Sequence, residues 1–352
     1  MWKVDWRVEI DGEDRSEAMS EYLISIEIEE GEGSEADKSA LTFSDTDGRL
    51  KLPKKGEKVH IWLDGVEAFS GVLDDPEWSI AKGQGRQLSV SAKGFDSRSK
   101  IKEPLDFHMD NVTLKDFLTE AGKRAGIDEV IVDPAFSDIR RDYWAAEGES
   151  FLHLGPRIAG EVGGTFKAKD KKAVLAKRGG GKTPSGEDMP VVEVDCTKTT
   201  TTCRVKPGIG RSDYSATRIR YFDRKEAKWK EENVEIKTGN DAPKAKDVVR
   251  YSKADKEQAE LVGKGRKADA ERGRGSGSAT IDLNPAARVE GTARVSNARE
   301  GIDGDYRIRS VKHRADRSGG STTDLTFGEP GKDAGKDKRK SESDSDNESG
   351  ED

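Results

Sequence analysis

Alternation of apolar and polar residues, the pattern of a strand with one buried face, marks the first hundred residues. It is clearest between residues 40 and 74, where short alternating runs are separated by turn residues at 45–48, 54–56 and 64–65. Asp64-Gly65 is a strong hairpin signal. Together these runs predict strands at 6–10, 23–28, 41–44, 50–52, 59–63, 69–73 and 87–92. We therefore expect an antiparallel barrel or rolled sheet over residues 1–103.

The pattern changes at residue 104. Thr113 precedes apolar positions spaced by three and four residues, which predicts a capped helix ending at Gly126. A strand follows at 127–132, and a second helix at 151–159, which we expect to be short or kinked because it contains Pro156. A hairpin is predicted within 163–176 and a loop at 179–186. Residues 104–186 thus form an α+β insert.

Alternation returns over residues 187–328 and predicts a second antiparallel barrel. Its expected strands are 191–194, 216–222, 233–236, 278–283, 288–295, 306–313 and 322–327, with a helical segment near 253–272. Residues 329–352 are polar and end in a run of acids and serines, which buries too little apolar surface to fold alone.

Composition favours a protein that assembles with others. Only 32% of the 352 residues are hydrophobic and 37% are charged, so the cores are modest and contacts with partners would add buried surface. The net charge of −7 argues against a nucleic-acid-binding chain. No apolar run reaches membrane-spanning length, and the N-terminus has no signal-peptide layout, so we expect a protein folded in a cytoplasm.

No motif indicates catalysis, a cofactor or a metal. The Gly-Lys-Thr at 181–183 lacks the glycine that a phosphate loop needs at position 176, which is Ala176, and loop residues follow it. His60, His108, His153 and His313 are too far apart in sequence for a local ligand pattern. We therefore predict no catalytic, cofactor-binding or metal site, and no cofactor.

Cys196 and Cys203 leave two alternatives open. On one continuous strand, residues seven apart face opposite sides, whereas a turn between them would let the thiols meet and form a disulfide. In a reducing cytoplasm two free thiols are expected instead, and a disulfide would form only after release from the cell.

A succession of motifs resembles the phage late control D family, the baseplate hub proteins of contractile tails, which are related to the hub part of VgrG spikes in type VI secretion. The resemblance rests on Leu-Thr-Phe-Ser-Asp at 41–45, Asp-Gly-Arg-Leu at 47–50, Leu-Pro-X-X-Gly at 52–56 and Phe-Ser-Gly-Val-Leu-Asp at 69–74. It continues in segments 111–118, 149–166 and 304–313 and spans about residues 5–328. The segment 253–277 and the acidic tail have no counterpart in it.

The resemblance implies a mainly β fold with two antiparallel, tail-tube-like barrel domains, an α+β insert and a trimeric hub. Three copies would form a ring that adapts the sixfold tail tube to the threefold central spike, with a channel for DNA, which passes through without specific binding. The implied partners are further copies of the chain, the tail tube or tube-initiator protein, the central spike protein, baseplate wedge proteins and the tape measure protein. The implied location is the tail baseplate of a virion assembled in the host cytoplasm, and the implied role is structural, not enzymatic.

The charged turn Lys54-Lys55-Gly56 is the segment we expect to contact a neighbouring subunit. One alternative is the hub of a tail-like bacteriocin or a type VI-like injection machine, and a second is a tail-associated cell-wall hydrolase.

Overall fold

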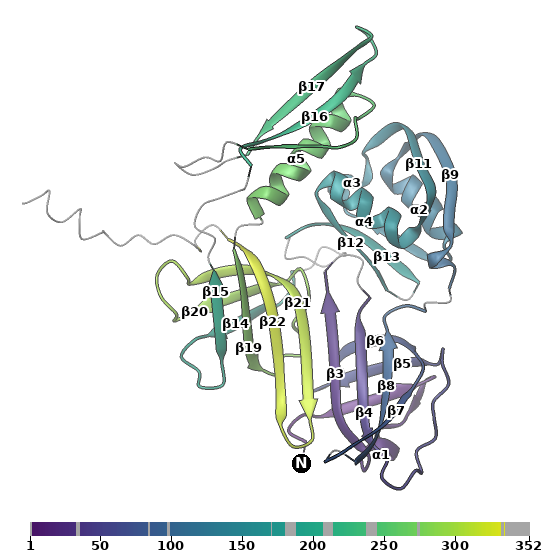
Figure 1. Cartoon of the computed structure of the whole chain (residues 1–352), viewed down its shortest axis with the longest axis vertical. Helices are drawn as coiled ribbons and strands as arrows, with labels where there is room; N and C mark the ends of the chain where they lie inside the picture. The colour runs from purple at the N-terminus through teal and green to yellow at the C-terminus, as the bar shows by residue number, and fades with distance from the viewer. Residues whose placement is uncertain are drawn as a thin grey trace, which may run out of the picture.

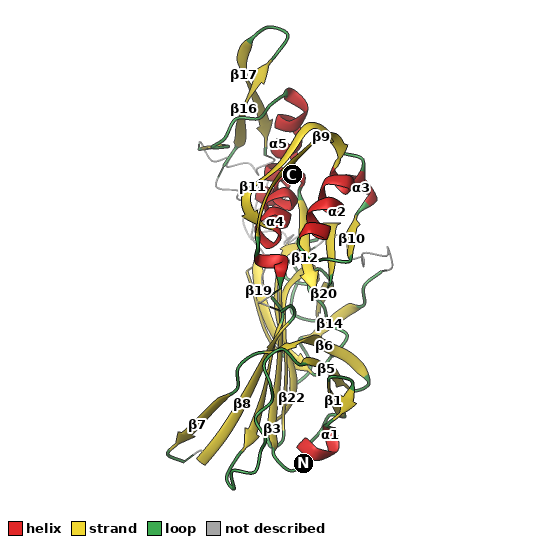
Figure 2. Ribbon diagram, turned by 90° about the vertical axis from the view of Figure 1, so that its right-hand side faces the viewer, coloured by secondary structure: helices red, strands yellow, loops and turns green. Residues whose placement is uncertain are grey.

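The computed structural model describes residues 2–331 and residue 334, except 33–35, 84, 97–98, 170, 180–187, 207–213, 237–244 and 273–274. Most described residues lie in antiparallel β-structure, with few helices, which confirms the mainly β class. A sheet of fourteen strands fills the lower half of Figure 1, and all helices except the short α1 lie in the upper half of Figure 2. No helix among the described residues is long and apolar enough to cross a membrane.

The first half of the large sheet contains β1 (Trp6–Ile10), β2 (Glu13–Asp14), β3 (Leu23–Gly31), β4 (Lys38–Ser44), β5 (Lys58–Leu63), β6 (Val66–Leu73), β7 (Glu77–Ala81) and β8 (Gly85–Lys93), with the short helix α1 (Ser16–Met19). Its second half contains β14 (Val191–Asp195), β15 (Thr202–Lys206), β19 (Ser276–Asp282), β20 (Thr292–Ser296), β21 (Gly304–Asp316) and β22 (Gly320–Pro330). The main path runs β15-β19-β22-β21-β3-β4-β8-β6-β5-β1-β2. Within the described part of the chain this sheet does not close into a barrel.

The two halves repeat one strand order. The first repeat is β3-β4-β8-β6-β5, and the second repeat is β15-β19-β22-β21-β20, with strands that follow each other along the chain in the same way. Beyond them the halves differ, because β1 runs antiparallel to β5 whereas β14 runs parallel to β20. The repeats are joined by pairing of β21 with β3, so the two repeats form one continuous sheet.

Each repeat encloses its own apolar core. In the first repeat, inward residues of successive strands, such as Ile26, Ile61 and Phe69, are fully buried. In the second repeat, Val295, Ile308 and Phe327 have the same role. Alternation along each strand therefore does what the sequence pattern predicts, with one face buried and the other polar.

The insert has a core of its own. Its elements are the 3₁₀ turn η1 (Lys100–Lys102), β9 (Pro104–Thr113), α2 (Leu114–Arg124), β10 (Glu129–Val132), α3 (Pro134–Ser137), β11 (Arg140–Ser150), α4 (Phe151–Val162), β12 (Gly164–Lys169) and β13 (Lys172–Lys177). β9 pairs with β11, and β10-β13-β12 form a second small sheet. Thr113 caps α2 in a capping box with Asp116, as its position predicts.

A third small sheet, β17-β16-β18, projects at the top of Figure 1. It consists of β16 (Ala216–Asp223), β17 (Lys228–Glu235) and β18 (Lys246–Val248), and α5 (Lys256–Arg272) covers one of its faces. Ile219, Tyr221 and Ala259 form the small core between sheet and helix.

Two local expectations are corrected, and two long strands were missed. Residues 50–52 form no strand. Leu50 and Leu52 alternate with Lys51 as in a strand, but the segment is a loop whose backbone pairs with no neighbouring strand. α4 is continuous through Pro156, since its buried face of Phe151, Leu154 and Ile158 compensates for the lost hydrogen bond. The long strands β9 and β11 were not expected. The loop at 179–186 lies mostly, and the acidic end of the tail wholly, outside the described residues.

Candidate assembly surface

Four strands of the large sheet, within the described residues, pair along one edge only: β2, β7, β14 and β15. Among the strands that the structure describes, β7 pairs only with β8, and β15 pairs only with β19. An unpaired edge offers a row of backbone donors and acceptors to another strand. β7 and β8 extend from the sheet at the lower left of Figure 2, where an approaching chain has access to β7.

Every residue of β7 is exposed, including two large apolar side chains. Trp78 is 50% and Ile80 is 64% exposed, and they lie on the same side of the strand as the buried Leu88 of β8. The indole Nε1 of Trp78 donates a hydrogen bond to Asp45 Oδ2 at 3.0 Å. The indole is therefore held in place on the core side of the sheet without being covered.

The exposed charged side chains of the edge strand β15 are cations, whereas β7 carries an acid. Cys203 and Val205 are half-buried against the second core, whereas Arg204 and Lys206 are exposed. Two exposed cations on β15 and Glu77 on β7 give these two edges complementary charge.

The predicted contact turn lies near the start of β7. Lys55 Nζ lies 2.7 Å from Asp74 Oδ1 and 2.7 Å from Asp75 Oδ2, and Lys93 Nζ lies 2.5 Å from Asp74 Oδ2. Hydrogen bonds from Lys55 and Lys93 lower the pKa of Asp74. Gly56 has a φ of 96°, which favours glycine at this position. The turn is thus fixed to its own chain through Lys55, while Lys54 is exposed.

The two cysteines lie side by side. Cys196 follows β14 and Cys203 is the second residue of β15, and both are free thiols. Burial and a side-chain hydrogen bond with Cys196 raise the pKa of Cys203 to about 12. Whether the pair forms a disulfide stays a prediction.

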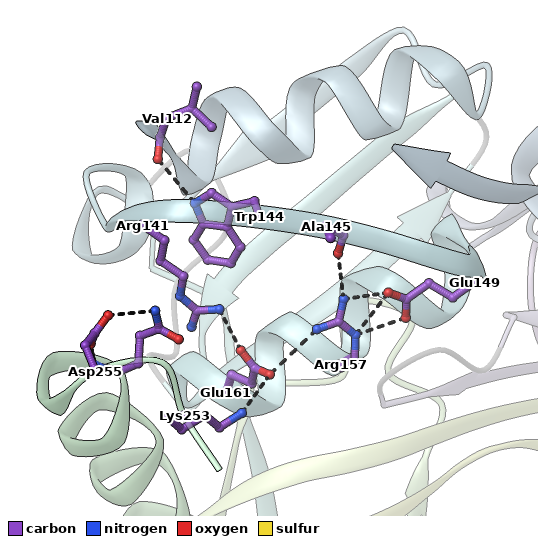
Figure 3. Close-up of polar contacts among 10 residues, drawn as sticks. Val112, Arg141, Trp144, Ala145, Glu149, Arg157, Glu161, Lys253 and Asp255 are labelled. Atoms are coloured by element: carbon purple, nitrogen blue, oxygen red, sulfur yellow. Dashed lines mark hydrogen bonds and ion pairs between the residues drawn. The ribbon is translucent and has the colours of Figure 1, made fainter. Parts of the chain in front are cut away.

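A charged network joins the insert to the segment that leads into α5 (Figure 3). Glu161 on α4 lies 2.9 Å from Arg141 Nη1, 3.3 Å from Lys253 Nζ and 3.7 Å from Arg157 Nη1. Burial raises the pKa of Glu161, but the charges of Arg141 and Lys253 outweigh this effect and leave the pKa lowered. The Arg141 guanidinium also lies 4.0 Å from the ring centre of Trp144.

This network lines an open cavity of about 610 Å³ between the insert and the segment that leads into α5. Arg157 binds Glu149 and the carbonyl of Ala145, so each carboxylate of Figure 3 that could act as an acid or base already has a charged or hydrogen-bonded partner. Such pairing is typical of a structural joint. The described residues also contain no group of His, Cys, Asp and Glu that could hold a metal ion.

Two further cations tie the parts together at the loop after β3. Lys167 on β12 lies 2.9 Å from Glu30 and 2.7 Å from Asp37. Arg307 on β21 is buried and lies 2.7 Å from Glu32 and 2.8 Å from Glu290. The insert and both repeats therefore meet through charged contacts around this loop.

Comparison with known proteins gives a consistent set of relatives. No family model matches the chain. It is 24% identical over 260 residues to a probable baseplate hub protein of Escherichia phage 186, which covers 70% of this chain and 66% of that protein. It is 24% identical over 196 residues to the probable baseplate hub protein of Escherichia phage P2, covering 54% and 49%. The matches thus span two thirds or less of the length of these relatives.

Solved structures share the fold over nearly the whole chain. A tail protein from Neisseria meningitidis MC58 matches with a TM-score of 0.68 at 15% identity, over 93% of this chain and 96% of that one. The 43 kDa tail protein of prophage MuSo2 from Shewanella oneidensis matches with a TM-score of 0.66 at 16% identity, over 92% and 98%. A type VI secretion component of E. coli matches with a TM-score of 0.54 at 12% identity, over 96% and 79%. At these identities the structural matches show a common fold.

Proposed function

We propose, on the premise that this chain belongs with the baseplate hub proteins it matches, that it is the structural hub of a contractile phage tail. The resemblance predicted from its motifs is confirmed by the two phage relatives. Because the matched region is two thirds or less of those proteins, the role of the whole chain is a proposal.

One observation carries this proposal: a repeated strand order with an unpaired edge strand in each repeat. A head-to-tail contact between unlike edges generates a ring when the rotation closes. Three copies with two repeats each would present six similar units to a sixfold tail tube, and three equivalent faces to a threefold spike. The chain would therefore act through shape and symmetry.

In this proposal each repeat becomes a barrel-like wall of the ring. The domains are residues 1–103, the insert 104–186, the second domain 187–328 and the acidic tail 329–352. The separate cores of the two repeats and of the insert support this division. The charged contacts of Lys167, Arg307 and Glu161 would hold the parts at fixed angles.

The partners follow from that position: two further copies of the chain, the tail tube or tube-initiator protein, the central spike, the wedge proteins and the tape measure protein. DNA would pass through the ring without specific binding, which the net charge of −7 supports. The paired carboxylates of Figure 3 support a non-enzymatic role.

Two residue-level proposals stay with this function. Lys54 and Gly56, beside the anchored Lys55, would contact a neighbouring subunit. Cys196 and Cys203 would stay reduced during assembly in the host cytoplasm, and a disulfide formed after release is the alternative. The intact mass with and without reductant distinguishes these two states.

The proposal is tested by locating the chain in assembled particles. Tagged full-length chain, carried into particles and labelled with gold, is expected at the end of the tail distal to the head. A label along the tail, or particles without label, would overturn the proposal. Headless particles without DNA would favour the bacteriocin or injection-machine alternative, and cleared peptidoglycan in a zymogram of the pure chain would favour the hydrolase.

A further inference from the structure

We infer that copies of this chain join by antiparallel pairing of β7 of one copy with β15 of the next, in a register that places Ile80 opposite Cys203. The inference rests on the proposed ring and names the contact that closes it. It follows from a junction that the chain already contains.

That junction is the pairing of β21 with β3, which links the second repeat to the first. β21 contributes the segment from Ser310 to Asp316, and β3 contributes the segment from Ser25 to Gly31. Ala315 of β21 packs within the core of the first repeat, and His313 is 3% exposed. The junction therefore continues the sheet and covers apolar surface at the same time.

The repeats align residue by residue from their hairpins. β7 and β8 end in the pair Ala81 and Gly85, and β21 and β22 end in the pair Asp316 and Gly320, each with three residues between. Counting back from these pairs, Ile80 corresponds to Ala315, Trp78 to His313 and Glu77 to Lys312. β7 thus occupies the place of the half of β21 that pairs with β3.

The other side of the junction aligns through the strands between. Ser89 of β8 pairs with Thr42 of β4, which pairs with Ser25 of β3. At the corresponding place, Asp324 of β22 pairs with Thr280 of β19, which pairs with Thr202 of β15. Ser25 therefore corresponds to Thr202, and the rest of β3 and β15 follows in step.

Transferring the register of the existing junction gives the new one. Ala315 pairs with Ile26, which places Ile80 opposite Cys203. His313 pairs with Ile28, which places Trp78 opposite Val205. Lys312 pairs with Glu29, which places Glu77 opposite Lys206.

The side chains in these pairs fit the transferred register. Trp78 and Ile80 are exposed in one copy, yet their counterparts His313 and Ala315 are buried by the junction with β3. Pairing with β15 would cover both against Val205 and Cys203, which face the same side as the second core. The charged pair is retained with its sign reversed, since Lys312 and Glu29 become Glu77 and Lys206.

A single new cysteine tests this register against a native one. Directly opposed residues of antiparallel strands have Cβ atoms about 4.5–5.5 Å apart, close to the distance that a disulfide needs. On a full-length Cys196→Ser background, Ile80→Cys with a mild copper oxidant is expected to give covalent dimers and trimers through Cys203. The matched control Ser79→Cys, on the opposite face of the same strand, should give at least tenfold less, and so should Ile80→Cys with Cys203→Ser.

Charge reversal keeps the test decisive if the cysteine variants fold poorly. Glu77→Lys is expected to weaken self-association at least tenfold in sedimentation, and adding Lys206→Glu should restore it. The inference is overturned if Ile80→Cys gives no more cross-linking than Ser79→Cys, or if the double reversal restores nothing. Because gold labelling locates the chain in particles independently, a labelled hub without this cross-link would reject the contact and leave the proposed function standing.

Discussion

The joint between the insert and the first repeat depends on Lys167. Its ammonium group lies 2.9 Å from Glu30 and 2.7 Å from Asp37, and its side chain is 26% exposed. Burial opposes the charge of Lys167, but the two acids outweigh it and raise its pKa. Asp37 itself is buried, and burial raises its pKa despite Lys167. The cation is therefore the main compensation for two acids in a poorly solvated place.

Lys167→Gln would leave Asp37 buried without its contacting cation, with only the positive charge of Lys169 nearby. Breaking a buried ion pair from one side costs about 3–5 kcal/mol. Since the Lys167 side chain keeps about a quarter of its exposure, solvent screening reduces this cost, and we expect a loss of about 2–3 kcal/mol in the free energy of unfolding. Urea unfolding followed by far-ultraviolet circular dichroism, with the slope of the transition compared between variants, measures this cost.

Lys172→Gln is the matched control, because it lies on the same hairpin and has a similar ion pair. Lys172 Nζ lies 2.9 Å from Glu129 Oε2, but the two side chains are 70% and 48% exposed. We expect its unfolding midpoint to equal that of the parent chain. Equal losses in both variants, or no loss in either, would refute the argument that burial gives the Lys167 contact its weight.

Two further predictions concern buried positions. Burial and the nearby charge of Arg288 lower the pKa of His313 to about 4, so the unfolded chain binds this proton more readily and stability falls as the pH drops from about 6.5 towards 4. The loss of stability is about 3 kcal/mol at most. Urea midpoints measured between pH 7 and 4.5 should depend less steeply on pH in His313→Gln than in the parent chain. An equal pH dependence in both would contradict the assignment to His313. A Cβ at Gly155 would lie 2.4 Å from the ring of Phe166, so Gly155→Ala should lower the stability of the insert by about 1–3 kcal/mol. Gly160→Ala on the same helix has open space around the new Cβ and should not lower it. Equal thermal midpoints for the two variants would show that the ring of Phe166 can move.

Features set by neighbouring residues were predictable from the sequence. The cap of α2 depends on Thr113 and a carboxylate three residues later, and the structure confirms both. The hairpin at Asp64-Gly65 needs two residues that tolerate positive φ, and they have φ values of 47° and 76°. Such signals are local and survive any tertiary arrangement.

Features set by distant partners were not predictable. In β7, Trp78 and Ile80 alternate with Glu77 and Ser79, but the run is short and no core of the same chain buries either side chain, so the segment was not predicted as a strand. β9 and β11 pair across the intervening α2, β10 and α3, and their register depends on that packing. Leu50 and Leu52 alternate like a strand but have no partner, because pairing is a property of the sheet and not of the segment.

The candidate assembly surface was only partly accessible to sequence reasoning. The contact of the charged turn at Lys55 with a neighbouring subunit stays a prediction, and its salt bridges to Asp74 and Asp75 were not predicted. The repeat is evident from the strand order and not from the residues. Ile80 and Ala315 occupy equivalent places in the two repeats, as do Cys203 and Ile26, but their side chains differ in size. The strand registers of the two repeats, which the sequence does not give, identify the edges of β7 and β15 as equivalent to the paired edges of β21 and β3.

The number of copies in the hub is the most direct test of the proposed trimeric ring. Baseplates released gently from labelled particles and weighed by native mass spectrometry should yield a complex with three copies of the 38.6 kDa chain, about 116 kDa in all before any spike mass. We expect a complex of three copies that is lost in Glu77→Lys and restored when Lys206→Glu is added. A single copy, or a ring of six, would contradict the proposed trimeric ring.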